Sequence, residues 1–303
     1  MRVFLIFSWL ICWQCVQLFG QTIPLFEQEA LRKVSLPESA SQLLVDEEGN
    51  LLILDTENAR LSKYIANTKF DSTLTIGGQS NRQEGFLHPI RISQKNRLNL
   101  YLLDDVQRRI VLLTINFKVV QEVNFNSLVS RLENLGEESE IFPLSFDINP
   151  AGEVFMLNQF DNKVLKINNF GDIEAVFGGL DYGEGSLYDP VELAVSDQNW
   201  VFVSDTTAQE IKVFDAYGVF RYTFQPAAPF RWKKFILSAS RLICYDETHF
   251  HIEHLSSKEF ISFSFPSPNR IRDLALNGSF FYVLLENGVS LQENSVHLYR
   301  LTP

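Results

Sequence analysis

The chain has 303 residues, of which 46% are hydrophobic and 21% are charged, and its formal net charge is −11. This apolar content is enough for a sizeable core and excludes a compositionally disordered chain. The excess of acidic residues disfavours nucleic acid and anionic membranes as partners.

The first twenty residues are typical of a secretory signal peptide. Arg2 supplies a positive charge, an apolar run extends from Val3 to Trp13, and a polar exit ends at Gly20. The apolar run is shorter than the roughly 20 residues that a membrane-spanning helix needs. We therefore expect removal of residues 1–20 and export of residues 21–303, without a transmembrane segment, to the periplasm, the outer-membrane surface or the extracellular space.

The cysteines are unevenly placed. Cys12 and Cys15 lie inside the expected signal peptide, and neither follows the small residue that lipoprotein cleavage requires. Cys244 is then the single cysteine of the exported chain, so no intramolecular disulfide can form there. Its position in the apolar run 242–245 predicts a small buried side chain inside a strand.

The rest of the sequence repeats one pattern, in which a proline precedes an Asp or Asn by fifteen positions. Three pairs share this interval: Pro89 and Asp104, Pro143 and Asn158, and Pro190 and Asp205. Looser copies end at Asp55 and Asp246, and a sixth copy, Phe281 to Leu285, lacks the acidic residue. The repeat ends at 55, 104, 158, 205, 246 and 285 are 49, 54, 47, 41 and 39 residues apart. This is the length of a four-stranded propeller blade, so the sequence predicts one all-β domain with six blades.

Each repeat also predicts a third and a fourth strand. The third strands are expected at Arg60–Tyr64, Arg109–Leu113, Lys163–Ile167, Glu210–Phe214, His249–Glu253 and Val296–Leu301. The fourth strands are expected at Thr73–Ile76, Val119–Phe125, Glu174–Phe177, Arg221–Phe224 and Glu259–Phe265. The sixth repeat ends at Pro303 without a fourth strand. We expect residues 30–36 to supply it by pairing with 296–301, which closes the ring and leaves no open blade.

One connection is longer than its equivalents. Asn126 to Ile141 carries Leu128, Leu132 and Leu135 at helical spacing. The segment predicts a short helix that caps one face.

Two stretches carry a further pattern of glycines, an apolar residue, a proline and a later acidic residue. The first stretch contains Gly77, Gly78, Glu84, Gly85, Phe86, Pro89, Asp104, Gln107 and Arg109. The second stretch contains Gly178, Gly179, Gly183, Gly185, Leu187, Pro190 and Asp205. The pattern resembles the NHL-repeat propellers of exported bacterial type, over all six repeats in spacing and closely in the second and fourth. The resemblance implies a six-bladed propeller. NHL-type folds include an amidating lyase and resemble six-bladed lactonases, which hold a metal at the central channel, but the ligand sets of those enzymes are not recognisable in this sequence.

Two sets of polar residues are candidate metal ligands. The residues that end the second strands, here called anchor residues, are Asp55, Asp104, Asn158, Asp205 and Asp246. We expect them to accept hydrogen bonds from backbone N–H groups of the following turn, with a calcium ring as the alternative. The histidine cluster is His249, His251 and His254, with His297 farther along the chain. Its spacing on a strand favours ordinary surface histidines over a zinc site.

The innermost strand of each blade presents one side chain to the central channel. These six positions, here called ring residues, are Gln42, Arg91, Ser145, Glu192, Lys234 and Asp273. They are polar and of mixed charge, so we expect Arg91 and Lys234 to be screened by Glu192 and Asp273 in a wet channel. They are also the candidate ligand-binding residues. As a solvent-exposed pair, Arg91 and Glu192 would contribute only about 0–1 kcal/mol to stability.

The sequence contains no glycine-rich phosphate loop, nucleophile elbow or paired metal motif, so it assigns no catalytic residue, metal ligand or cofactor. The preferred function is an exported, non-catalytic binding or scaffold module for a protein or glycan partner, as a monomer or within an envelope complex. One alternative is a metal-dependent lyase or lactonase-like enzyme with its site at the channel. The other is a receptor or sensor component for a small polar ligand.

Overall fold

The computed structural model describes residues 22–24, 32–37, 39–70, 73–80, 85–134, 140–238, 240–265, 269–286 and 294–300. The expected signal peptide, residues 1–20, lies outside this part of the chain, as does Leu135. Within these ranges, the structure contains no helix with the length and hydropathy needed to span a membrane.

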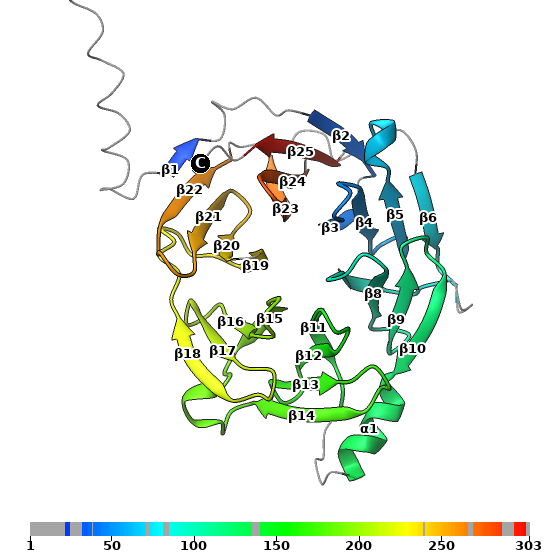
Figure 1. Ribbon diagram of the computed structural model, residues 1–303, viewed down its shortest axis with the longest axis vertical. Helices are drawn as coiled ribbons and strands as arrows, with labels where there is room; N and C mark the ends of the chain where they lie inside the picture. The colour runs from blue at the N-terminus through cyan, green and yellow to red at the C-terminus, as the bar shows by residue number, and fades with distance from the viewer. Residues whose placement is uncertain are drawn as a thin grey trace, which may run out of the picture.

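Six sheets surround a central axis as the blades of a propeller (Figure 1). Blade 1 contains β3 (Ala40–Val45), β4 (Leu51–Asp55), β5 (Arg60–Tyr64) and β6 (Thr73–Gly77), and blade 2 contains β7 (Pro89–Ser93), β8 (Asn99–Asp104), β9 (Arg109–Thr114) and β10 (Val119–Asn124). Blade 3 contains β11 (Pro143–Ile148), β12 (Val154–Asn158), β13 (Lys163–Ile167) and β14 (Ile173–Gly178), and blade 4 contains β15 (Pro190–Val195), β16 (Val201–Asp205), β17 (Glu210–Phe214) and β18 (Phe220–Phe224). Blade 5 contains β19 (Lys234–Ser238), β20 (Arg241–Tyr245), β21 (His249–His254) and β22 (Phe260–Ser264), and blade 6 contains β23 (Arg270–Asn277), β24 (Phe280–Glu286) and β25 (Asn294–Arg300). The predicted six-bladed fold is confirmed.

The N-terminal segment closes the ring as predicted. β2 (Arg32–Leu36) is the outermost strand of blade 6 and pairs antiparallel with β25, with Arg32 opposite Leu298 and Leu36 opposite Asn294. A second contact was not predicted: β1 (Thr22–Pro24) adds a fifth, parallel strand to blade 5 beside β22. Figure 1 shows β1 and β2 at the outer rim of two adjacent blades.

Apolar residues form the core between the blades. Each of the six boundaries between adjacent blades holds one apolar cluster, because both faces of a blade pack against neighbours. The second strands β4, β12 and β16 are therefore buried at every residue. Cys244 lies fully buried in the cluster between blades 4 and 5, as predicted, and burial raises the pKa of its thiol well above the usual value.

Four anchor residues, Asp55, Asp104, Asp205 and Asp246, accept hydrogen bonds from backbone N–H groups of the following turn, as predicted. Asp104 accepts hydrogen bonds from the backbone N–H groups of Gln107, Leu87 and His88, at 3.1, 2.8 and 3.1 Å. Asn158 accepts one from the Phe142 N–H at 2.8 Å. These bonds join the turn after the second strand to the start of the first strand in the same blade.

The glycine pairs form the turns between blades. Gly77 has φ +100°, and a Cβ atom there would lie 2.4 Å from the Ala59 carbonyl oxygen and 2.7 Å from the Phe86 ring. Only glycine fits this position, because other residues rarely adopt the conformation and would also clash.

The expected helix is present, but its position differs from the prediction. α1 (Phe125–Asn134) packs against the outermost strands β10 and β14, at the rim between blades 2 and 3, instead of capping a face of the ring (Figure 1). Leu128 and Leu132 are fully buried there, since the apolar stripe of the helix covers the gap between the two blades. Single-turn 3-10 helices lie at Ala66–Thr68 and Gly183–Gly185.

Candidate functional site

The six ring residues occupy equivalent places in the six blades. In blades 1, 2, 3, 4 and 6 the register of the first two strands shifts just before the ring residue, as between Pro89 and Arg91. Such a bulge redirects the side chain that follows it. In blade 5 Lys234 takes the same place opposite Tyr245 without a shift.

Five of the ring residues bind the backbone of the next blade. Gln42 exchanges two hydrogen bonds with the backbone of Ile92 (3.2 and 2.7 Å), Ser145 Oγ accepts from Leu193 N (3.2 Å), Glu192 Oε2 accepts from Phe235 N (3.1 Å), Lys234 Nζ donates to Arg272 O (3.2 Å) and Asp273 Oδ2 accepts from Leu43 N (2.8 Å). The structure therefore brings these predicted residues together and uses each of them to hold two blades in contact.

Arg91, the sixth ring residue, makes its hydrogen bonds to blade 4, beyond the adjacent blade 3. Its Nη1 lies 2.6 Å from Glu192 Oε1 in blade 4, and its Nη2 donates to the Leu193 carbonyl oxygen at 3.4 Å. The two charged side chains are only 21% and 11% exposed, so the expectation of a solvent-exposed pair was wrong. Burial acts to lower the pKa of the Arg91 guanidinium, but the neighbouring carboxylates, Glu192 foremost, outweigh burial and raise it.

A second layer of polar contacts lies two residues farther along the innermost strands. Asp147 Oδ2 accepts a hydrogen bond from Val195 N at 2.8 Å and pairs with Lys95 Nζ at 3.2 Å, while Oδ1 accepts from the Ser93 hydroxyl. Sequence analysis did not identify Asp147, although its spacing of two from Ser145 on one strand puts both on the same face.

The donor set of the channel does not fit a metal ion. Both ring carboxylates, Glu192 and Asp273, already accept backbone N–H bonds and pair with Arg91 or with the Tyr245 hydroxyl, which lies 2.7 Å from Asp273 Oδ1. Across the described ranges, no three His, Cys, Asp or Glu side chains gather closely enough to hold a metal.

The histidine cluster differs from the prediction at one residue. His251 is fully buried instead of lying at the surface, with Nδ1 2.8 Å from Ser262 Oγ and Nε2 3.4 Å from Glu253 Oε2. Glu253 in turn accepts from the Ala227 N–H at 2.9 Å, so the connection before blade 5 covers this face. Burial acts to raise the pKa of Glu253, but its hydrogen bonds, that of His251 first, lower it.

Two cavities open at the ends of the channel. One, of about 400 Å³, lies between blades 5 and 6 on the face that carries the anchor residues, and Lys234, Tyr245 and Arg270 line it. The pKa of Tyr245 is raised well above its usual value by burial and by Asp273, and burial likewise raises the pKa of Asp273. The lining of this mouth therefore combines the Tyr245 side chain with charged side chains of both signs: Lys233, Lys234, Arg270 and Arg272, and Asp246, Glu247 and Glu286.

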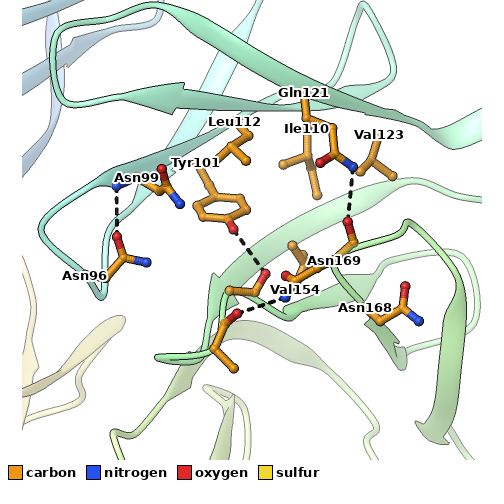
Figure 2. Close-up of a pocket in the computed structure, with 12 residues that line it drawn as sticks. Asn96, Asn99, Tyr101, Ile110, Leu112, Gln121, Val123, Val154, Asn168 and Asn169 are labelled. Carbon is orange, nitrogen blue, oxygen red and sulfur yellow. Dashed lines mark hydrogen bonds between the residues drawn. The ribbon is translucent and has the colours of Figure 1, made fainter.

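The other mouth is richer in carboxylates. Its cavity, of about 380 Å³, is lined by Asp46, Glu47, Glu48 and Asp197 and by Lys95 and Arg97, among others. Asn96 lines it too and also lines a third cavity between blades 2 and 3, of about 160 Å³ (Figure 2). Two hollows thus adjoin on the face opposite the anchor residues.

Exposed aromatic side chains are concentrated on two of the six blades and the connections that lead into them. Among the described residues, nine phenylalanines and tyrosines count as exposed, and seven of them belong to blades 3 and 4 or to the connections that lead into these blades. The seven are Phe142, Phe160, Phe170, Tyr182, Tyr188, Tyr217 and Tyr222. Phe142 and Phe160 also contact each other, with ring centroids 6.3 Å apart. Phe160 lies in the turn after β12 and Phe170 in the turn after β13, so the seven side chains are distributed over both faces of these two blades.

Comparison with known proteins supports the fold and leaves the activity open. No protein-family model matches the sequence, and no curated protein is similar to it in sequence. Among solved structures, virginiamycin B lyase from Staphylococcus aureus has a TM-score of 0.57 at 12% identity, covering 90% of this chain and 89% of that one. A streptogramin B lyase has 0.57 at 10% identity, covering 91% and 90%. A catalytically inactive S. aureus virginiamycin B lyase with quinupristin has 0.56 at 11%, covering 89% of each chain.

Proposed function

We propose that the protein is an exported, non-catalytic binding module whose rigid ring presents blades 3 and 4 to a protein or glycan partner. The observation that carries the proposal is that seven of the nine exposed phenylalanine and tyrosine side chains among the described residues belong to these two blades and their connections. Tyrosine and phenylalanine supply large contact areas with little loss of side-chain entropy, and they are enriched at interfaces. The signal-like N-terminus supports export.

The hydrogen bonds of the channel favour the same proposal. A catalytic carboxylate needs an oxygen free to reach a substrate, whereas Glu192 and Asp273 each use both oxygens within the ring. Replacing either side chain would disturb the contact between blades as well as any chemistry. Phe142 and Phe160, which are exposed and contact each other, do not take part in these contacts of the ring.

The test compares two surface variants in partner capture. The chain is cross-linked in an envelope extract of the organism that makes it, with Phe142→Ser/Phe160→Ser as the test variant and Phe280→Ser, an exposed aromatic of blade 6, as the matched control. A partner held by the wild type and the control but lost by the double variant is expected. Equal capture by all three chains would refute a partner surface on blade 3.

A lyase-type enzyme is the second candidate, and one feature favours it. The cavity of about 400 Å³ places the Tyr245 hydroxyl, hydrogen-bonded to Asp273, beside Lys234, and the structural neighbours are lyases. Incubation with quinupristin, the compound named with one neighbour, tests this candidate. Turnover that Tyr245→Phe abolishes would support the enzyme, and no turnover by the wild type would leave this substrate class without support.

A further inference from the structure

The third cavity has an uncharged lining. It lies between blades 2 and 3, and its twelve lining residues include no Asp, Glu, Lys or Arg, although 21% of the chain is charged. Five of the twelve are carboxamides: Asn96, Asn99, Gln121, Asn168 and Asn169. Tyr101, Ile110, Leu112, Val123 and Val154 supply an apolar floor (Figure 2). A ligand that fits this lining is neutral and rich in hydrogen-bonding groups.

Part of the lining is held rigid by internal hydrogen bonds. The Tyr101 hydroxyl donates to the Gly152 carbonyl oxygen at 3.1 Å, Gln121 Nε2 donates to Asn169 O at 3.2 Å, and Asn169 Nδ2 donates to Ala151 O at 3.0 Å (Figure 2). All three bonds cross from blade 2 to blade 3 or join two turns of blade 3. The cavity is therefore preformed between two packed blades, which reduces the entropy lost on binding.

Other polar atoms of the lining remain available to a ligand. Among the described residues, the Asn99 carboxamide has no hydrogen-bond partner; only its backbone N–H binds, to Asn96 Oδ1 at 2.8 Å. Gln121 and Asn169 each use the amide nitrogen in the bonds above, which leaves their side-chain oxygens as acceptors. A carboxamide both donates and accepts, so these groups match the alternating hydrogen-bond needs of hydroxyl groups.

Two exposed apolar side chains stand next to the lining in sequence. Leu98, between Asn96 and Asn99, is 71% exposed, and Phe170, directly after Asn169, is 85% exposed. Phe170 is held at the tip of a tight turn, where its backbone N–H donates to Asn168 Oδ1 at 2.9 Å. A flat aromatic side chain that directly follows a carboxamide of the lining in the chain suits a sugar ring, which has apolar C–H faces and a polar edge.

We propose that this cavity binds one terminal unit of a neutral saccharide, with hydroxyl or N-acetyl groups hydrogen-bonded to Asn99, Gln121 and Asn169 and a ring face against Phe170. This proposal rests on the proposed binding function and makes it more specific, because it assigns a saccharide to the partner. A volume of about 160 Å³ equals that of about five liquid waters, which favours a single terminal unit over an internal segment of a polymer.

The experiment measures binding of the whole chain to saccharides by saturation-transfer NMR and calorimetry. The probes are neutral oligosaccharides with and without N-acetyl groups, a uronic-acid oligosaccharide and a neutral peptide. Asn99→Ala and Phe170→Ala are the test variants. Asn116→Ala and Phe280→Ala are the controls, because they remove an exposed Asn and an exposed aromatic that do not line the cavity and that do not belong to the seven aromatic side chains of blades 3 and 4.

We expect a neutral saccharide to bind with an affinity that salt does not change, and each test variant to weaken it by about tenfold while the controls bind as the wild type does. No saccharide binding, preference for the uronic acid or the peptide, or equal loss in the controls would overturn the proposal. The wider binding function is judged separately, because partner capture by Phe142 and Phe160 does not involve this cavity.

Discussion

Arg91 of blade 2 and Glu192 of blade 4 form an ion pair of 2.6 Å that passes blade 3, where the equivalent ring residue, Ser145, is the smallest of the six. Arg91 and Ser145 also share a partner, because Arg91 Nη2 donates to the Leu193 carbonyl oxygen and Ser145 Oγ accepts from the Leu193 N–H. The pair and Ser145 therefore act together in connecting three blades.

Replacing either partner of this pair should destabilise the fold. Arg91→Met or Glu192→Gln is expected to cost about 1–3 kcal/mol, between the values for exposed and fully buried pairs, because both side chains are largely buried. The double variant should lower the free energy of unfolding by less than the sum of the two single variants, since removing both charged side chains leaves no unpaired charge. Urea unfolding of all four proteins gives the coupling energy, and additive costs would contradict the interaction.

Leu36 in the closing strand β2 should matter more than its neighbours. It is 5% exposed and packs between blades 6 and 1, so Leu36→Ala is expected to lower the free energy of unfolding by about 2–4 kcal/mol. Lys33→Ala on the same strand is exposed and should change it by less than about 0.5 kcal/mol. Equal effects in urea unfolding would mean that β2 contributes little to closure.

His297 makes the ring closure sensitive to acid. Burial, helped by Lys33 opposite it on β2, lowers the pKa of His297 to about 4. Between about pH 6.5 and 4 the unfolded chain binds the extra proton and the folded chain does not, so stability is full above this window and falls as the pH falls through it. The loss is at most about 3 kcal/mol.

The comparison of wild type with His297→Gln isolates this effect. The variant cannot take up the proton, so its stability should fall less between pH 7 and pH 4 in urea unfolding. Parallel pH profiles for the two proteins would show that His297 does not titrate in this way.

Cys244 should react with thiol reagents only when blade 5 opens. It has no exposed surface, and burial together with Glu253 and Glu192 raises its pKa, which disfavours the reactive thiolate. Labelling in native buffer is expected to be slow and to accelerate in denaturant in step with unfolding. Rapid labelling of the native protein would place the thiol near the surface.

The sequence predicted the blades because their signals are local. Pro89 and Asp104 face each other across one pair of strands, and the hydrogen bonds of Asp104 reach only the two neighbouring turns. The closing strand followed from counting strands. The three-residue strand β1 was not predicted, because its partner strand β22 lies about 240 residues later in the sequence and no local turn pattern links the two strands.

The candidate sites were harder to predict than the blades. The six ring residues follow from one position per blade, but their partners do not, because Arg91 pairs with Glu192, 101 residues away and two blades farther along. His251 has the sequence context of an exposed strand residue, and only Ser262 and Glu253 satisfy it in the interior. The carboxamide cavity combines turns of two blades and has no linear spacing to detect.

The strand β1 also determines how the chain responds to mechanical tension. A pull on the N-terminus loads the three residues of β1 on blade 5 before it reaches the five residues of β2 that complete blade 6. We expect the shorter strand to detach first, so that the released residues extend while the ring stays closed. A protein tethered through its N-terminus could therefore give way by a few residues without losing the surface it presents.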